Sequence, residues 1–211
     1  MYKITIKDSK PIKLGPFTSS KKELIDLLKS WLAISLAFGI AIGGGYIALT
    51  STNIFSLVGL SAIAVGLGFL VHELAHKIMA QKYHCWAEFR SFDNMLWLAM
   101  AMSLFGFVLA APGAVMIRGR VTPDRNGKIS LAGPLSNILI AMAFLAAGFF
   151  IAAEGFLMTL VNYGFMINTW LALFNLLPIG NFDGRKIWKW NKRAYIITAI
   201  AAGALFLLMF V

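Results

Sequence analysis

The sequence predicts an all-α integral membrane protein with about five to six transmembrane helices. Hydrophobic residues make up 59% of the 211 residues and charged residues only 13%, about half of the charged share in a soluble globular domain. The apolar residues form runs of about 20, the length that a helix needs to cross the hydrocarbon core of a bilayer. We expect one membrane domain over residues 31–211, preceded by a cytoplasmic N-terminal segment over residues 1–30.

Basic residues outnumber acidic ones, and their positions along the chain indicate a role in membrane topology. The net charge is +10, and the Lys and Arg residues occur in short clusters between the apolar runs rather than on one patch. Such clusters are typical of loops on the cytoplasmic side of a membrane. We therefore expect a lipid bilayer and no nucleic acid as a partner. The single cysteine, Cys85, excludes an internal disulfide and a cysteine-based zinc site.

Five apolar runs are predicted to cross the membrane. Ser20 and Glu23 have the S-x-x-E spacing of a capping box, which predicts that a helix begins near Lys21 and continues into the first span. The predicted spans are residues 31–50, 54–80, 129–151, 156–177 and 194–211. Before them, residues 2–6 alternate between apolar and polar side chains and predict a short strand.

Residues 95–117 are apolar as well, but we predict that they are re-entrant or sheet-like. Gly106, Pro112 and Gly113 interrupt them, and basic clusters flank both ends. The positive-inside rule places both clusters in the cytoplasm, so the segment must enter the membrane and return. Irregular backbone is tolerated at that depth only where it pairs within the protein or lines a wet cavity. The chain then crosses five times, with its N-terminus in the cytoplasm and its C-terminus outside.

The motif His72-Glu73-Leu74-Ala75-His76 lies near the end of the second predicted span. Residues four apart share one face of a helix, so His72 and His76 can hold one metal ion while Glu73 points at its bound water. Zinc lowers the pKa of a bound water to about 7, and a neighbouring carboxylate can pass the proton to a leaving amine. The motif therefore predicts peptide hydrolysis. A chance match is the alternative, but ionisable groups in hydrocarbon cost about 3 kcal/mol or more and usually mark function.

A catalytic zinc site keeps three protein ligands and an open position, so a third ligand must come from elsewhere in the chain. Asp183 is the stronger candidate, because the count of spans brings it to the depth of the histidines while Pro178 and Gly184 break the helix around it. Its alternative role is to cap a helix beside a neighbouring arginine. His84 follows His72 by twelve residues, without the glycine turn of the metzincin pattern. We therefore place His84 in a cytoplasmic loop rather than on the metal.

Taken together, the motifs resemble those of the site-2 protease family of intramembrane zinc metalloproteases. Residues 72–76 are similar to its H-E-x-x-H element, and residues 133–137 to its G-x-x-x-N element. Residues 175–178 with the pair at 183–184 are similar to its N-x-x-P-x-x-x-x-D-G element. The motifs come in the family's order, and the resemblance implies a three-span catalytic core over about residues 54–190. At 211 residues the chain has no room for an inserted PDZ domain or an appended CBS domain.

The resemblance also implies roles for further residues. It implies that Asp183 completes the ligand set of one zinc ion per chain, and that Asn137 and Asn175 border the active site. Gly133 and Pro178 would support them as members of the same motifs. Read without the family, Gly133 indicates close packing of two helices and Asn137 an interhelical hydrogen bond.

The prediction for function is a zinc-dependent endopeptidase that cleaves transmembrane protein substrates in regulated intramembrane proteolysis. We expect a multi-pass protein of the cell membrane, with the N-terminus and the active-site end in the cytoplasm. Glu73 would act as general base and then as acid to the leaving amine. Two other classes stay open: a membrane metal transporter, in which the same side chains would line an ion path, and a catalytically inactive adaptor that binds helices. The sequence leaves the oligomeric state open.

Overall fold

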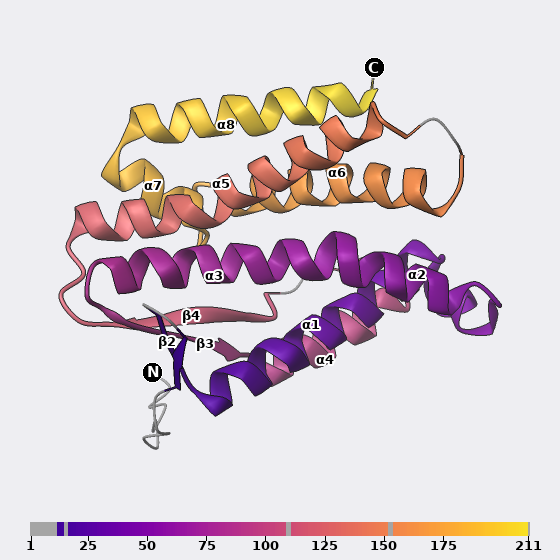
Figure 1. Ribbon diagram of the computed structural model, residues 1–211, viewed down its shortest axis with the longest axis horizontal. Coiled ribbons are helices and arrows are strands. Elements are labelled where there is room, and N and C mark those ends of the chain that lie inside the picture. Colours follow the sequence, from indigo (N-terminus) through magenta and orange to yellow (C-terminus); the bar gives the residue numbers. More distant parts are fainter. Residues whose placement is uncertain (1–11, 15–16, 109–110, 152–153, 211) are drawn as a thin grey trace.

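The computed structural model describes residues 12–14, 17–108, 111–151 and 154–210, and the strand expected over residues 2–6 lies outside them. Five helices in this part of the chain are long and apolar enough to cross a membrane. They are α1 (Lys21–Ile42), α2 continuing into α3 (Ile54–Lys82), α5 (Pro123–Gly148), α6 (Phe156–Asn175) and α8 with its last turn (Lys192–Phe210). The predicted fold class is confirmed. Figure 1 shows these helices extending along the molecule, with consecutive ones running in opposite directions.

The first long helix lies nearer the N-terminus than the predicted span. It begins at Lys21, where the Ser20 side chain accepts a hydrogen bond from the Glu23 backbone N–H at 3.2 Å, as the capping box predicts. It ends at Ile42 instead of continuing to residue 50, because Gly44 and Gly45 have φ angles of 91° and 79°. That left-handed conformation ends a helix and is favourable for glycine. Residues 45–50 form a separate 3₁₀ helix.

The second long helix contains a π-helical turn just before the H-E-x-x-H motif. The chain passes from α2 (Ile54–Ser61) through this turn (Ala62–Gly66) into α3 (Leu67–Lys82). Side chains from other helices donate to carbonyl oxygens of the turn: Trp31 to Ala62 at 3.1 Å and Asn168 to Ala64 at 3.0 Å. Single π-helical turns are frequent at functional sites. Here the turn connects the histidine-bearing helix to α1 and α6.

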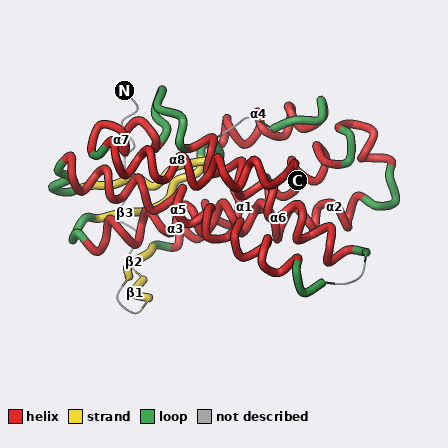
Figure 2. The backbone as a smooth tube through the Cα atoms, turned by 90° about the horizontal axis from the view of Figure 1, so that it is seen from above, coloured by secondary structure: helices red, strands yellow, loops and turns green. Residues whose placement is uncertain are grey.

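The segment between α3 and α5 leaves one end of the helices and returns to it, as predicted. Strand β3 (Trp86–Ser91) pairs antiparallel with β4 (Gly113–Arg118), and Trp86 lies opposite Arg118. Figure 2 shows the strands confined to one end of the helical bundle. The sequence did not indicate that α4 (Asp93–Ser103) occupies the first part of this segment. Its Met, Leu and Ala residues have high helix propensity, and the helix packs along α1.

The C-terminal half of the chain surrounds one apolar cluster. Helix α5 begins at Pro123, six residues before the predicted span, because Thr122 caps it by accepting from the Arg125 N–H at 3.3 Å. The short helix α7 (Asp183–Trp190) follows α6 and precedes α8. Buried side chains of all four helices form the cluster: Ile138, Ala141, Phe165, Ala172, Leu176, Ile187, Ala202 and Leu205. This packing fixes the start of α7 against α5 and α6.

A buried ion pair, which the sequence did not indicate, joins the first turn of α1 to α3. Lys77, at 5% exposure, donates to the carboxylate of Glu23, which is fully buried. The same carboxylate accepts from the Ser19 hydroxyl at 2.7 Å and from the Phe89 backbone N–H at 2.9 Å. In the sequence, Lys77 reads as the first of the basic residues that follow the second apolar run. Its ammonium instead ties α3 to α1 and β3.

We predict that Glu23→Ala lowers the free energy of unfolding by about 3–5 kcal/mol, because it leaves the Lys77 ammonium buried without a partner. The thermal midpoint of the detergent-solubilised protein measures the effect. Glu154→Ala removes an exposed glutamate and is the matched control. Equal midpoints for the two variants would contradict a structural role for the ion pair.

Candidate metal centre

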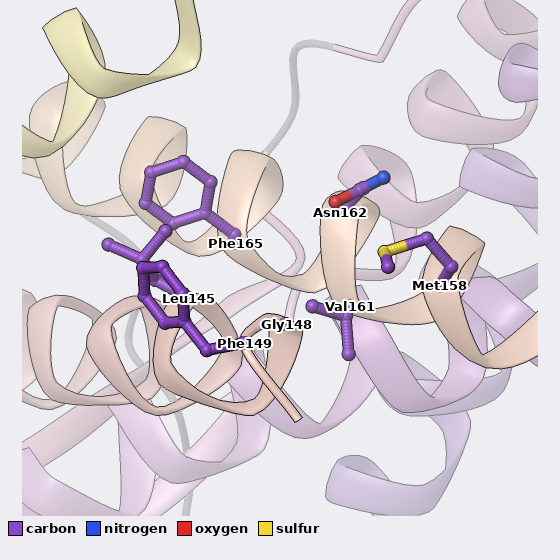
Figure 3. A pocket seen from close by; sticks show the side chains of 7 residues that line it. All are labelled: Leu145, Gly148, Phe149, Met158, Val161, Asn162 and Phe165. Atoms are coloured by element: carbon purple, nitrogen blue, oxygen red, sulfur yellow. The ribbon is translucent and has the colours of Figure 1, made fainter. Parts of the chain in front are cut away.

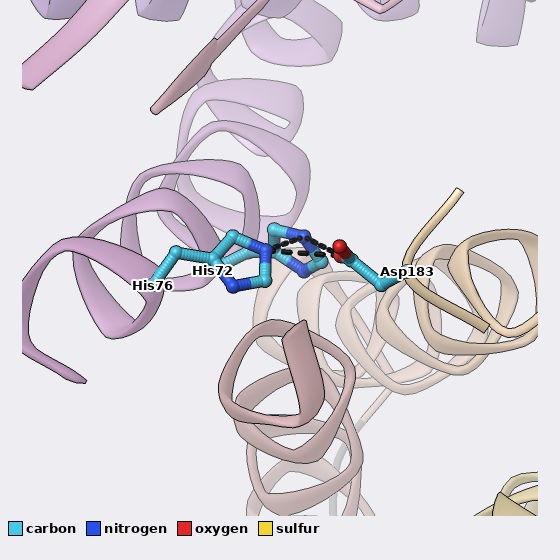
Figure 4. A group of neighbouring side chains, drawn as sticks. All are labelled: His72, His76 and Asp183. Atoms are coloured by element: carbon cyan, nitrogen blue, oxygen red, sulfur yellow. Dashed lines mark hydrogen bonds and ion pairs between the residues drawn. The ribbon is translucent and has the colours of Figure 1, made fainter. Parts of the chain in front are cut away.

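Two imidazoles and a carboxylate from separate helices converge on one point. His72 and His76 extend from α3, and Asp183 is the first residue of α7 (Figure 4). The two histidine Nε2 atoms are 3.0 Å apart, and Asp183 Oδ2 lies 3.5 Å from that of His72 and 3.0 Å from that of His76. All three side chains are buried, with the residues between 5% and 8% exposed. Within the described residues, this is the group of His, Cys, Asp and Glu side chains placed to hold a metal ion.

Helix α5 orients both imidazoles through their other ring nitrogen. His76 Nδ1 lies 2.8 Å from the Ile129 carbonyl oxygen, and His72 Nδ1 lies 2.6 Å from Asn137 Oδ1. Because these oxygens only accept hydrogen bonds, each Nδ1 carries the proton and each Nε2 directs its lone pair at the centre. Histidines that ligate metals almost always have such a second partner.

Asn137 is itself held by a chain of buried amides. Its Nδ2 donates to the Gly68 carbonyl at 3.2 Å and to Asn168 Oδ1 at 3.1 Å. Asn168, which is fully buried, donates in turn to the Ala64 and Gly164 carbonyls at 3.0 and 2.9 Å. The amide oxygen of Asn137 is therefore fixed in the orientation that accepts from His72. The residue type alone predicted an interhelical hydrogen bond for Asn137. That bond is present, and the same side chain also accepts from His72 of the metal centre.

Two glycines of the motifs lie where a side chain has no room. A Cβ atom on Gly133 would lie 2.4 Å from His76 Nε2 and 2.6 Å from His72 Cε1. A Cβ atom on Gly184 would lie 2.0 Å from the Leu176 carbonyl oxygen. Glycine at the first position lets α5 approach the imidazoles, and glycine at the second lets α7 begin against the end of α6.

The other candidate residues from the sequence, Asn175, Pro178 and His84, lie outside the ligand cluster. Asn175, the last residue of α6, donates to the Leu171 carbonyl of its own helix at 2.9 Å. Pro178 is exposed in the loop that separates α6 from α7, where its ring prevents the helix from continuing. His84 is exposed in a turn, with φ of 59°, and does not belong to the cluster. Asn175 therefore bonds within α6, and Pro178 lies between that helix and the one that begins with Asp183.

Glu73 is partly exposed, in contrast to the three buried side chains beside it. Its carboxylate lies near His72, Asp183 and Lys186 and beside the Val115 backbone N–H in β4. A carboxylate in this position reaches both the ligand cluster and the space beside the sheet.

Lys186 holds the second oxygen of Asp183, with Nζ 3.0 Å from Oδ1. Burial by itself raises the pKa of the Asp183 carboxyl, but His76, His72 and Lys186 outweigh it and hold that pKa well below its usual range. Asp183 is therefore ionised at neutral pH, the state in which a carboxylate binds a metal.

Sequence reasoning missed Asn168 and Lys186. Asn168 carried a signal, since a polar side chain in the middle of an apolar span commonly faces the interior of a helix bundle. Lys186 did not, because it is one of several basic residues after Asp183.

A separate hollow lies at the far end of α5 and α6 (Figure 3). It has a volume of about 220 Å³, and its lining includes Leu145, Phe149, Met158 and Phe165, with Asn162 as its polar side chain. None of the ligand side chains lines it. We assign no chemistry to this hollow.

The donor set fits zinc. Two neutral imidazole nitrogens and one carboxylate oxygen, with hydrogen-bonded outer partners, are the three protein ligands of a common catalytic zinc site. Comparison with known proteins points the same way. A protein of Methanocaldococcus jannaschii named "Putative zinc metalloprotease" is 41% identical over 187 residues, which cover 87% of this chain and 92% of the relative.

This chain belongs to that zinc metalloprotease family. Its apolar helices make it a membrane member, and its cofactor is zinc. No family model matches the sequence, and no solved structure matches it. The cluster of His72, His76 and Asp183 is the part of the described structure that fits the metal of a zinc metalloprotease.

We predict that Asn137→Leu weakens zinc binding by about 10–100-fold, because His72 loses the acceptor that fixes its ring. Competition with a chromogenic chelator measures the zinc affinity. Asn162→Leu makes the same replacement at an exposed position of α6 and should leave the affinity unchanged. If both variants bind zinc like the wild type, Asn137 does not orient the ligand.

Proposed function

We propose that this protein is a zinc-dependent intramembrane endopeptidase of the site-2 protease type. It hydrolyses peptide bonds within or near transmembrane helices of membrane proteins, in regulated intramembrane proteolysis. One observation carries the proposal: two residues of the metal cluster, His72 and His76, lie together with Glu73 on a helix with the length and composition of a membrane span. A substrate that reaches this site must come from within or beside the bilayer.

The residues divide the chemistry between them. His72, His76 and Asp183 would hold the zinc ion, with Asn137 and the Ile129 carbonyl fixing the two rings. Bound zinc polarises a peptide carbonyl and lowers the pKa of water. Glu73 takes a proton from the attacking water and delivers it to the nitrogen of the leaving amine. Its partial exposure favours this role, since the group must meet water and substrate as well as the site.

The outer edge of β4 is suited to hold the unwound substrate. The Phe89 N–H donates to Glu23 rather than to β4, so Phe89 and Val115 form a non-hydrogen-bonded pair of the antiparallel ladder. Val115 and, two residues on, Ile117 then direct their backbone groups away from β3, on the side where Glu73 meets the Val115 N–H. A substrate strand can pair with such an edge, as in other peptide-binding proteins.

The charge pattern supports a multi-pass protein of the cell membrane with the active-site end in the cytoplasm. Basic residues cluster before α1, from the end of α3 into β3, from the end of β4 into α5, and from α7 into the start of α8. The connections around residues 51–53 and 154–155 at the other end carry only Glu154. Transmembrane protein substrates are the partners that this arrangement favours.

We predict that purified wild-type protein with about one zinc ion per chain cleaves single-span membrane substrates within the span. Glu73→Gln should keep the zinc and lose cleavage by about a thousandfold or more, because it removes the general base. Asp183→Ala should lose both. Zinc is quantified by atomic absorption and cleavage by mass spectrometry of the products.

Two outcomes of that experiment would contradict parts of the proposal. Full zinc occupancy in Asp183→Ala would remove Asp183 from the ligand set. Cleavage by neither protein, with equal zinc flux into liposomes for wild type and Glu73→Gln, would favour the metal transporter.

We predict that Ile117→Pro lowers cleavage about tenfold, because it removes one outward N–H that would bond the substrate strand. Proline is tolerated where the N–H is not used by the sheet, so the thermal midpoint should stay close to that of wild type. Ile117→Val keeps the N–H and is the matched control. Full cleavage by a folded Ile117→Pro protein would show that this edge does not hold the substrate.

A further inference from the structure

A cleft of about 610 Å³ lies between the end of β4 and α7. One wall includes Ile117 in β4 and Val121 after it, and the other includes Arg185 and Lys189 in α7. Lys186 lines the cleft as well and contacts Asp183, so the cleft lies next to the metal centre. A strand paired with the outer edge of β4 would pass from the site directly into this cleft.

The cleft is strongly cationic. Three basic side chains of α7 line it, and no carboxylate is among its lining residues. Arg185 donates to the Gly180 carbonyl at 3.0 Å, and neither Arg185 nor Lys189 forms an ion pair within the described part of the chain. The neighbouring Asp124 is already engaged by Lys128 at 2.8 Å and by the Trp190 N–H at 2.9 Å. The positive charge of the cleft is therefore available to a ligand.

We propose that this cleft binds the cytoplasmic flank of the substrate and selects flanks with acidic residues over flanks with basic ones. The inference rests on the proposed function and on the cytoplasmic orientation of the site. Apolar and amide side chains beside the cations, among them Ile117, Val121, Trp190 and Asn181, suit an extended peptide better than an isolated anion.

The selection has a clear physical consequence for which proteins are cut. Most transmembrane segments carry Lys or Arg on their cytoplasmic flank. Arg185 and Lys189 repel such flanks, so the cleft rejects the bulk of membrane proteins by like charge. A span whose cytoplasmic flank is acidic meets attraction at the same place. The cleft thereby discriminates between spans that the apolar part of the site would treat alike.

The experiment uses three forms of one single-span substrate, with Glu, Gln or Lys at three consecutive positions directly on the cytoplasmic side of the span. Their dissociation constants are measured on Glu73→Gln protein in phosphatidylcholine vesicles, and kcat/KM is measured on the wild type. The Glu form should bind about tenfold more tightly than the Lys form, since each exposed charge pair contributes a small factor. The preference should decrease as salt screens the charges.

Charge reversal tests the assignment to these residues. Adding Arg185→Glu and Lys189→Glu should reverse the order of the Glu and Lys forms. Lys192→Glu with Arg193→Glu changes the charge equally at exposed positions of α8 outside the cleft, and it should leave the order unchanged. Lys189→Gln, the milder variant, should reduce the preference if the double reversal does not fold.

The outcomes separate this proposal from the proposed function. Equal binding of the three forms, or reversal by the α8 control, overturns the selective cleft even if the wild type cleaves them all. The expected binding order without any cleavage supports the cleft and argues against the protease. Loss of the preference in vesicles of equal phosphatidylcholine and phosphatidylglycerol, with tighter lipid binding that needs Arg185 and Lys189, would assign the cleft to lipid headgroups and overturn the proposal.

Discussion

The metal centre depends on two hydrogen bonds from imidazoles to α5. His72 and His76 can direct both Nε2 atoms at one point only if each Nδ1 proton has an acceptor, and in a bundle of apolar helices no water can be assumed to supply one. Gly133 lets α5 come close enough to provide both acceptors. The adjoining Pro134 has no N–H to donate to the Ser130 carbonyl, so the helix lacks one backbone bond beside Ile129, whose carbonyl accepts from His76. Gly133 and Asn137 are four residues apart, so the G-x-x-x-N spacing places both on the face of α5 that meets the histidines.

Buried polar groups elsewhere in the bundle serve to position this helix pair. The amide chain from Asn137 through Asn168 ends on the π-helical turn before the histidines, and the ion pair of Glu23 and Lys77 fixes the end of the same helix just after them. Unpaired, each of these groups would cost several kcal/mol in a membrane interior. Because they are paired across helices, they restrict how α3 can rotate or slide. The ligand geometry is thus held from both ends of α3.

Local patterns in the sequence were sufficient to predict which three side chains come together in the cluster, and to predict most of the spans. The helical spacing of His72 and His76, and the helix break before Asp183, are properties of neighbouring residues, so they could be predicted. Three features could not be predicted: where α1 ends, that part of the segment between α3 and α5 is helical, and which groups Lys77 pairs with. Glycine conformation and pairing across more than fifty residues decide them. Asn168 shows the same limit. A polar residue within an apolar span is visible in the sequence, but its partner depends on how α5 and α6 pack.

Under the proposed function, the arrangement of sheet and helices would address the main obstacle to cutting a transmembrane helix. A peptide bond inside a helix is shielded by backbone hydrogen bonds, and breaking them in hydrocarbon leaves groups that cost several kcal/mol each. An edge strand beside Glu73 offers replacement partners at the place where the helix must open. The opposite strand cannot play this part, because the Phe89 N–H and its carbonyl are already engaged by Glu23 and Arg90. The buried charges of α1 and β3 therefore leave β4 as the strand whose outer edge can pair with the substrate that we propose.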